Sequence, residues 1–215
     1  MTFGKNNGSW MLGLPALLLI WLCLPGLVPM SVAETSPQSE EAGSIGWSVE
    51  QLIERLARNP ESEIRFEETT FSTLLTQPMK TKGVLRFTPP AGLEKHITAP
   101  HEERYLIEGD TIRFESKPKG KNGTLSLQDY PALRAFIEAF RSTLSNDVMT
   151  LRRFYSMTLQ GEPRHWDLIL RPLDASVQEL AETIRFSGER EHIQRIEILA
   201  PGGDRSVMVM TTGLP

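Results

Sequence analysis

The segment Pro131–Leu144 constrains the fold more than any other part of the chain. A proline at a first-turn position suits the start of a helix. Apolar side chains then recur at helical spacing, at Leu133, Phe136, Ile137, Phe140 and Leu144. A stripe of this length must lie against another layer of structure, so the rest of the chain has to supply one.

Short segments with alternating apolar residues flank this helix on both sides. Turn signals such as Gly109-Asp110 and residues 201–204 separate neighbouring segments. The expected strands are 64–71, 80–88, 93–98, 104–108, 111–116 and 124–127 before the helix, and 155–159, 166–170, 184–186, 193–199 and 207–210 after it.

A second amphipathic helix is expected at Val49–Arg58, where Ser48 and Gln51 form a capping-box pattern and Pro60 follows. Short helical turns are expected near 147–153 and 175–181. The helices are too few to connect successive parallel strands, so the strands must pair as antiparallel hairpins.

The predicted fold class is therefore α+β, with one large, curved antiparallel sheet whose concave face is covered by the helices. An immunoglobulin-like sandwich is the alternative, but it has no place for a helix with five apolar positions.

The N-terminal segment predicts export. Lys5 is the one charged residue before Glu34, an uncharged apolar stretch runs from Trp10 to Met30, and residues 31–33 are small. These are the parts of a cleaved secretory signal, expected at residues 1–33. Retention as a membrane anchor is the alternative, but several prolines and glycines interrupt the apolar stretch.

Residues 34–46 are acidic and without periodicity, which predicts a flexible lead-in to a single domain over 47–215. Cleavage would remove Cys23, the one cysteine, so stability must come from a core. The net charge of −4 argues against nucleic acid as a partner.

No catalytic or metal-binding pattern is present in the sequence. The four histidines have no metal-ligand spacing, and no serine elbow or cysteine nucleophile is available. The sequence therefore predicts a protein that is not an enzyme and needs no cofactor. The basic run 117–121 is expected to be a solvated loop, or a contact for an acidic partner.

Two segments, residues 83–90 (GVLRFTPP) and 101–114 (HEERYLIEGDTIRF), resemble the LolA-like family of periplasmic lipoprotein carriers. In that family a glycine-led strand ends near a proline, and an apolar strand later enters a hairpin with glycine at its turn. The order of elements fits from Trp47 to Thr212. The chain departs from the family where Pro89 replaces an arginine associated with cargo hand-off, and where Leu93 replaces an aromatic residue.

This resemblance implies an open, incomplete β-barrel with a helical lid over an apolar cavity. The residues expected to line the cavity are Leu85, Phe87, Leu93, Ile97, Tyr105, Ile107, Ile112, Phe114, Leu133, Phe136, Ile137 and Phe140. From the pattern alone, ordinary core packing is the favoured interpretation of the apolar stripe of the long helix; with the resemblance, core packing and pocket lining fit it equally well.

The resemblance also implies a monomeric periplasmic carrier of acyl chains, from a lipoprotein or another lipid-linked product, that meets an inner-membrane donor complex and an outer-membrane acceptor. A lipid-sensing regulator or adaptor that binds a membrane protein is the alternative.

Overall fold

A computed structural model describes residues 47–58 and 63–211 of the 215-residue chain. The chain divides into two units, Met1–Trp47 and Ser48–Pro215, and the account below concerns the second unit. The expected signal at 1–33 and the lead-in at 34–46 lie outside the described residues. No helix among those described is long and apolar enough to cross a membrane.

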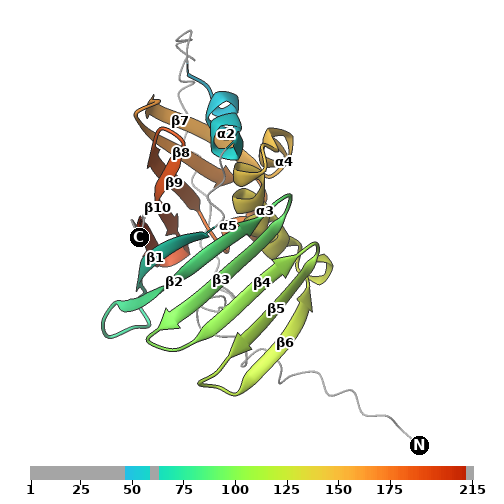
Figure 1. Cartoon of the computed structure of the whole chain (residues 1–215), viewed down its shortest axis with the longest axis vertical. Coiled ribbons are helices and arrows are strands. Elements are labelled where there is room, and N and C mark those ends of the chain that lie inside the picture. Colours follow the sequence, from blue (N-terminus) through green and yellow to red (C-terminus); the bar gives the residue numbers. More distant parts are fainter. Residues whose placement is uncertain (1–46, 59–62, 212–215) are drawn as a thin grey trace, which may run out of the picture. The chain divides into compact units, whose positions relative to one another are not determined.

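Eleven antiparallel strands form one sheet that does not close on itself (Figure 1). The strand order is β6-β5-β4-β3-β2-β1-β11-β10-β9-β8-β7. The strands are β1 (Glu63–Phe71), β2 (Met79–Thr88), β3 (Gly92–Ala99), β4 (Glu103–Glu108), β5 (Thr111–Ser116), β6 (Lys121–Ser126), β7 (Tyr155–Glu162), β8 (His165–Pro172), β9 (Thr183–Glu189), β10 (His192–Leu199) and β11 (Arg205–Thr211).

The first and last strands pair with each other in the middle of the sheet. Phe66 on β1 lies opposite Met210 on β11, and Thr70 lies opposite Ser206. Every other pairing joins strands that follow each other in the sequence. The sheet is therefore two hairpin series, β1–β6 and β7–β11, joined by one long-range pairing.

The long connection from β6 to β7 runs between opposite edges of the sheet and carries most of the helical structure. It contains a short 3₁₀ turn, η1 (Leu127–Asp129), and the helices α3 (Pro131–Leu144) and α4 (Val148–Phe154). Helix α2 (Val49–Arg58) precedes the sheet, and α5 (Ala175–Gln178) links β8 to β9. Figure 1 shows α2 and α4 beside α3 at the end of the sheet that holds β7 and β8.

Local signals account for the helix ends. At α2, the Ser48 hydroxyl accepts from Gln51 N at 3.3 Å and the Gln51 side chain accepts from Ser48 N at 3.4 Å, which confirms the capping box. Asp147 caps α4 by accepting from Thr150 N at 3.0 Å. Asp174 does the same for α5 through Ser176 N at 2.8 Å.

The predicted architecture is confirmed, with corrections to several boundaries. Strand β6 begins at Lys121, inside the run predicted as a loop, and ends at Ser126. Strand β7 continues to Glu162, three residues beyond the expected end at 159. The turn at 201–204 is confirmed: Gly202 and Gly203 have φ of 77° and 86°, a backbone region in which glycine is unstrained.

Helix α3 is buried more widely than its predicted stripe. The buried side chains include Ala135 and Ala139, and also three consecutive residues, Arg141, Ser142 and Thr143. Three consecutive positions cover most of a helical turn, so α3 has neighbours on more than one side. It packs against α2, α4, α5 and η1, and it contacts the sheet through Phe140 on Phe186 and through Tyr155.

Candidate functional site

The register of the strands brings eight of the predicted site residues to one face of the sheet. Side chains of directly opposed residues share a face. Phe87 lies opposite Leu93, Leu93 opposite Ile107, and Ile107 opposite Ile112, which gives a continuous apolar row across β2–β5. By the same register, Leu85, Ile97, Tyr105 and Phe114 lie on this face too.

The ring contacts of α3 identify this face as the one that the helix covers. Phe140 meets Phe186 of β9 edge-on, with ring centroids 5.5 Å apart. Phe186 lies opposite Ile196, and the register carries this face through Met208 and Glu68 to Thr81 on β2. Thr81 and Leu85 share a face because side chains alternate along a strand. We call this surface the inner face.

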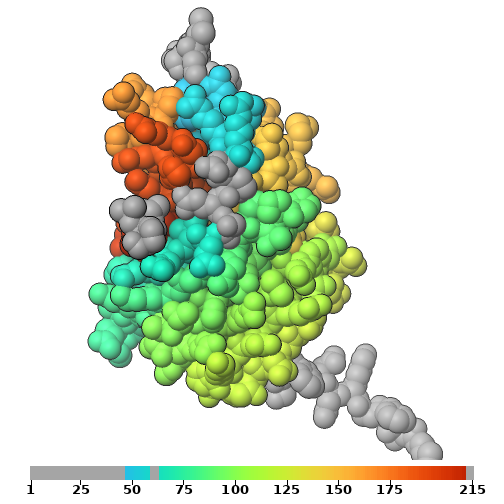
Figure 2. Space-filling model, viewed as in Figure 1, coloured from blue at the N-terminus to red at the C-terminus, as the bar shows by residue number. Residues whose placement is uncertain are grey.

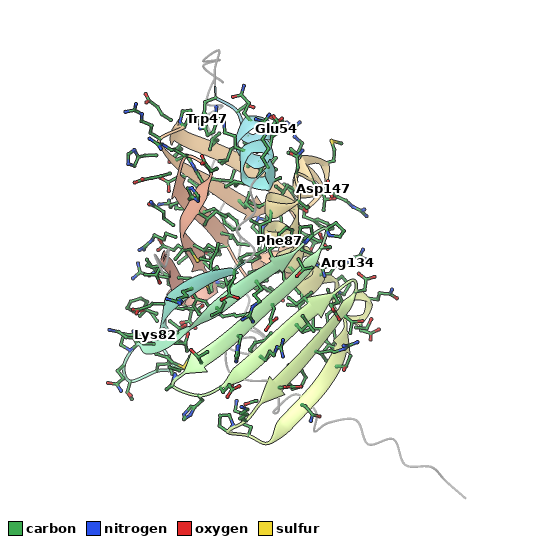
Figure 3. The ribbon with its side chains drawn as sticks, in the orientation of Figure 1. Trp47, Glu54, Lys82, Phe87, Arg134 and Asp147 are labelled. Atoms are coloured by element: carbon green, nitrogen blue, oxygen red, sulfur yellow. The ribbon has the colours of Figure 1, made fainter. Side chains whose placement is uncertain are left out.

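All twelve predicted site residues are shielded from solvent, but the structure does not bring them into one group. Among the strand residues, Phe87, Ile97, Tyr105 and Ile112 are buried, and on α3 so are Leu133 and Ile137. The others are half-buried. Phe140 packs against β9 and Phe136, in the half of the sheet away from β2–β5. Figure 3 shows Phe87 toward the end of β2 that leads into β3 and Lys82 toward the other end.

Helix α3 is tied to the β4–β5 turn as well as to β9. Arg141 Nη2 donates to the carbonyl oxygen of Gly109 at 2.7 Å. Upstream, Leu127 N donates to Asp110 O at 2.7 Å, and the Gln128 side chain donates to the Asp110 carboxylate at 3.1 Å. The helical connection from β6 to β7 is therefore held by contacts with both halves of the sheet.

A buried ion pair interrupts the apolar inner face. Lys95 Nζ lies 2.6 Å from Glu68 Oε2 and 5.3 Å from the centre of the Phe66 ring. Glu68 also accepts hydrogen bonds from Ser206 Oγ at 2.5 Å and Thr81 Oγ1 at 3.4 Å. The glutamate side chain is 5% exposed and the lysine 25% exposed.

The surroundings of Glu68 favour its ionised form. Burial works to raise its pKa, but the charge of Lys95 and the hydrogen bonds from Lys95, Ser206 and Thr81 outweigh burial, so the pKa lies below the ordinary glutamate value. The two charges therefore form a compensated pair.

Gly83 is the inner-face residue of β2 between the two members of this pair. On β2 it lies between Thr81, which is opposite Glu68, and Leu85, which is opposite Lys95. A Cβ at Gly83 would lie 2.1 Å from the His96 carbonyl oxygen, so the strands approach too closely there for any side chain. With no side chain at Gly83, the inner face of β2 is bare between Thr81 and Leu85.

In the sequence, Lys95 alternates with Leu93 and Ile97, which places it on their face of the strand, but nothing nearby in the sequence identifies its partner. Glu68 lies two residues after Phe66 and therefore on the same face of its strand, at a position expected to be apolar. The available signal for the ion pair was that Glu68 and Lys95, which carry opposite charges, both occupy inward positions on nearby strands. The pairing of β1 with β11, which brings Ser206 to Glu68, had no local signal.

A second polar group lies at the end of the inner face near β5. The Tyr105 hydroxyl donates to Glu103 Oε2 at 2.8 Å, and Ser116 Oγ donates to the other Glu103 oxygen at 3.0 Å. Burial, together with the Glu103 carboxylate, raises the pKa of Tyr105. Tyr105 therefore contributes its ring to the apolar face while its polar tip is held by a neighbour.

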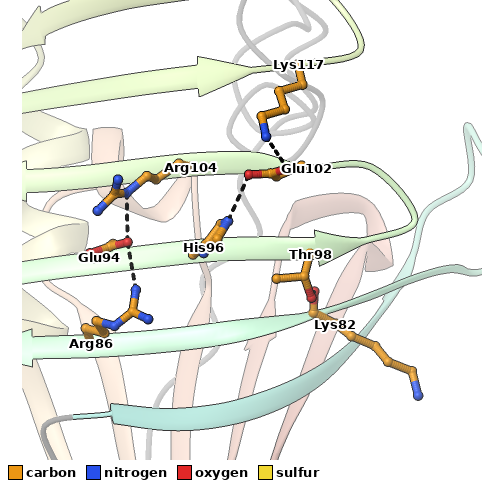
Figure 4. Close-up of polar contacts among 8 residues, drawn as sticks. All are labelled: Lys82, Arg86, Glu94, His96, Thr98, Glu102, Arg104 and Lys117. Carbon is orange, nitrogen blue, oxygen red and sulfur yellow. Dashed lines mark hydrogen bonds and ion pairs between the residues drawn. The ribbon is translucent and has the colours of Figure 1, made fainter.

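The opposite, outer face of these strands carries charged side chains in pairs (Figure 4). Glu94 lies between Arg86 and Arg104, at 3.0 and 2.8 Å. Glu102 contacts His96 at 3.4 Å and Lys117 at 2.5 Å. Figure 2 shows β2–β6 as one continuous surface. Because the outer face is charged and the inner face is mostly apolar, the inner face is the candidate binding site.

Pro89 lies in the turn between β2 and β3, beside an open depression of about 420 Å³. Leu93, Leu106 and Gly109 line the same depression. The turn of β4 and β5 that holds α3 is therefore adjacent to the position at which the sequence departs from the carrier pattern.

Comparisons with solved structures give weak overall similarity. A LolA superfamily protein from Nitrosomonas europaea is 11% identical with a TM-score of 0.40, covering 79% of this chain and 96% of its own. A putative outer membrane lipoprotein-sorting protein domain from Vibrio parahaemolyticus is 10% identical with a TM-score of 0.40, covering 78% and 93%. A chain of the Pseudomonas aeruginosa MucA/MucB complex is 10% identical with a TM-score of 0.39, covering 76% and 56%.

No curated protein matches the sequence. A family model described as "Outer membrane lipoprotein carrier protein LolA-like" matches residues 41–213, which include every described strand and helix. The chain therefore belongs to the LolA-like family of outer membrane lipoprotein carrier proteins.

Proposed function

We propose that this protein binds the acyl chains of a lipoprotein or another lipid-linked product against the inner face of its sheet and carries them towards the outer membrane. The observation that carries the proposal is the apolar row Phe87–Leu93–Ile107–Ile112, which four strands build on the face that α3 covers. The family's description as carriers supports the same function.

Apolar contact alone is strong enough for such carriage. Each buried methylene contributes about 0.8 kcal/mol. Ten of them give about 8 kcal/mol before the costs of ordering the chain and protein are subtracted. A polar site is not needed for affinity, and no chemical change in the cargo is required.

The proposed mechanism is displacement. In the empty protein, α3 packs on the inner face through contacts such as Phe140 with Phe186. An acyl chain replaces such contacts with its own, so loading has a small net cost.

We further propose that the carrier works in the periplasm as a monomer. Residues 1–33 provide the export signal, and an inner-membrane donor and an outer-membrane acceptor are its partners. The balanced charges of the outer face, where carboxylates and bases pair across strands, suit brief encounters with such partners.

Native mass spectrometry of the protein purified from a bacterial periplasm tests the proposal. Lipid should be found bound to the unaltered protein. Phe87→Asp and Phe136→Asp should each abolish loading, because a carboxylate on the inner face or on the helix that covers it is costly to cover with hydrocarbon. Val84→Asp is the matched control, since Val84 is on β2 but faces outward, and it should load normally.

An empty protein that also refuses added lipid contradicts the proposal. So does unchanged loading in Phe87→Asp. Crosslinking in cells distinguishes a carrier from a regulator: a carrier gives brief contacts with a donor and an acceptor, whereas one permanent partner points to regulation.

A further inference from the structure

The position of Lys95 is unusual for a cation. It lies opposite Leu85 on β2 and Tyr105 on β4, and its neighbours on the same face of β3 are Leu93 and Ile97. Its ammonium group is therefore held within the surface that we propose for acyl chains. Burying an ammonium there is unfavourable unless it is paired and hydrogen-bonded.

Glu68 is saturated by its neighbours, but Lys95 is not. The glutamate accepts from Lys95, Ser206 and Thr81 and is almost fully buried. An ammonium has three N–H donors. Among the described residues, the Lys95 ammonium contacts the Glu68 carboxylate and the face of the Phe66 ring. The lysine side chain is 25% exposed. Lys95 therefore retains donors that can serve a bound molecule.

Charge balance selects the kind of acceptor that would meet these donors. Glu68 already compensates Lys95, so a second anion would be repelled by the carboxylate and would leave its own charge unpaired. A neutral oxygen carries no such cost. The carbonyl oxygen at the head of an acyl chain is a neutral acceptor attached directly to hydrocarbon.

We propose that Lys95 donates a hydrogen bond to the carbonyl oxygen of the bound acyl group, so that the ligand is a neutral acyl ester or amide rather than a hydrocarbon, an ether or an isoprenoid. This inference rests on the proposed function. It adds that the chain enters in one orientation, with its carbonyl at Lys95 and its methylenes along the apolar row.

Two glycerol lipids of equal chain length provide the probe. 1-Dodecanoylglycerol and 1-O-dodecylglycerol differ only in a carbonyl group in place of a methylene, and their affinities are compared by displacement of a fluorescent lipid below the micelle concentration. The unaltered protein should bind the ester about tenfold more tightly, as expected for one hydrogen bond to a charged donor.

The variant must remove the lysine without leaving a buried charge. Lys95→Met alone would strand the Glu68 carboxylate, so the double variant Glu68→Gln/Lys95→Met is used. It should bind both lipids with the affinity that the unaltered protein has for the ether. Lys82→Met is the matched control, because Lys82 of β2 pairs with Glu67 of β1 on the outer face, with both side chains about 60% exposed. It should keep the tenfold preference.

A second measurement needs no variant. With ¹³C at the ester carbonyl, the infrared carbonyl band of the bound lipid should lie at lower frequency than in hydrocarbon solvent, because a hydrogen bond weakens the C=O bond. A bound band at the hydrocarbon position overturns the inference.

The outcomes separate this inference from the function on which it rests. Equal binding of ester and ether by the unaltered protein overturns the role of Lys95 and leaves acyl-chain carriage in place. A preference that persists in the double variant also overturns it. Failure of both lipids to bind contradicts the proposed function itself.

Discussion

Arg141 on α3 donates from Nη2 to the carbonyl oxygen of Gly109, at 2.7 Å, in the turn between β4 and β5. The side chain is 5% exposed and also contacts Glu138 at 3.3 Å. This bond joins the helix that packs on β9 to the opposite half of the sheet. This hydrogen bond therefore helps to hold α3 over the inner face.

Arg141→Met should lower the free energy of unfolding by about 1.5–3 kcal/mol, because a buried hydrogen bond from a charged donor is lost. Arg134→Met, on the same helix and facing the same turn, is the control. Arg134 lies 3.8 Å from Asp110 and is half exposed, so its loss should cost less than about 1 kcal/mol. Urea unfolding measures both. Equal effects would contradict a special role for Arg141.

The Glu68–Lys95 pair should make the protein sensitive to acid. The pKa of Glu68 is lower in the folded protein than in the unfolded chain, so the stabilisation is present above the ordinary glutamate pKa of about 4.3 and is lost as the pH falls through the folded value. Glu68→Gln should therefore lose less stability than the unaltered protein between about pH 5 and pH 3.

Urea unfolding across that range gives the two slopes. Glu67→Gln, in the exposed pair with Lys82, is the control and should keep the slope of the unaltered protein. A Glu68→Gln slope identical to that of the unaltered protein would show that the pair contributes nothing to acid sensitivity.

Gly83→Ala should destabilise the protein by about 1–3 kcal/mol, the usual cost of overpacking. The new Cβ would lie 2.1 Å from the His96 carbonyl oxygen and 2.9 Å from Ile97 Cα, and backbone atoms move only if the strands separate. Gly92→Ala is the control, since its Cβ would lie 3.1 Å from atoms of Thr88 at the end of the hairpin. Thermal unfolding of the two variants should rank Gly83→Ala as the less stable one.

Tyr155→Phe should cost about 1 kcal/mol, because the buried hydroxyl donates to the Ala135 carbonyl oxygen of α3 at 2.8 Å. Tyr130→Phe removes a hydroxyl from a residue that is 37% exposed and should change stability by less than about 0.5 kcal/mol. Denaturant titration tests the difference. An unaffected Tyr155→Phe would mean that this bond does not hold α3 on β7.

The export signal proposed at residues 1–33 predicts a processed chain. Protein recovered from a bacterial periplasm should begin at Glu34, because signal peptidase requires small residues such as Ala33 at the cleavage site. Ala33→Phe should block processing and leave the longer chain in the membrane fraction. Intact-mass measurement distinguishes the two forms, and an unprocessed native chain would favour the anchor.

The sequence by itself determined the local structure and the facing of the strands. Alternation with a period of two put Leu85 and Phe87 on one face and Val84 and Arg86 on the other, and the register confirms this. The start of α2 followed from its capping box, and the start of α3 from Pro131. These features depend on contacts within a few residues, which a sequence pattern records directly.

Only the tertiary structure decided what the faces meet. The pairing of Phe66 with Met210 joins segments from opposite ends of the chain, and no local pattern specifies it. That pairing brings Ser206 to Glu68, and Lys95 reaches the same carboxylate from β3. The wide burial of α3 likewise depends on which elements surround the helix. Periodicity gives the direction of a side chain, whereas its neighbours are fixed by non-local packing.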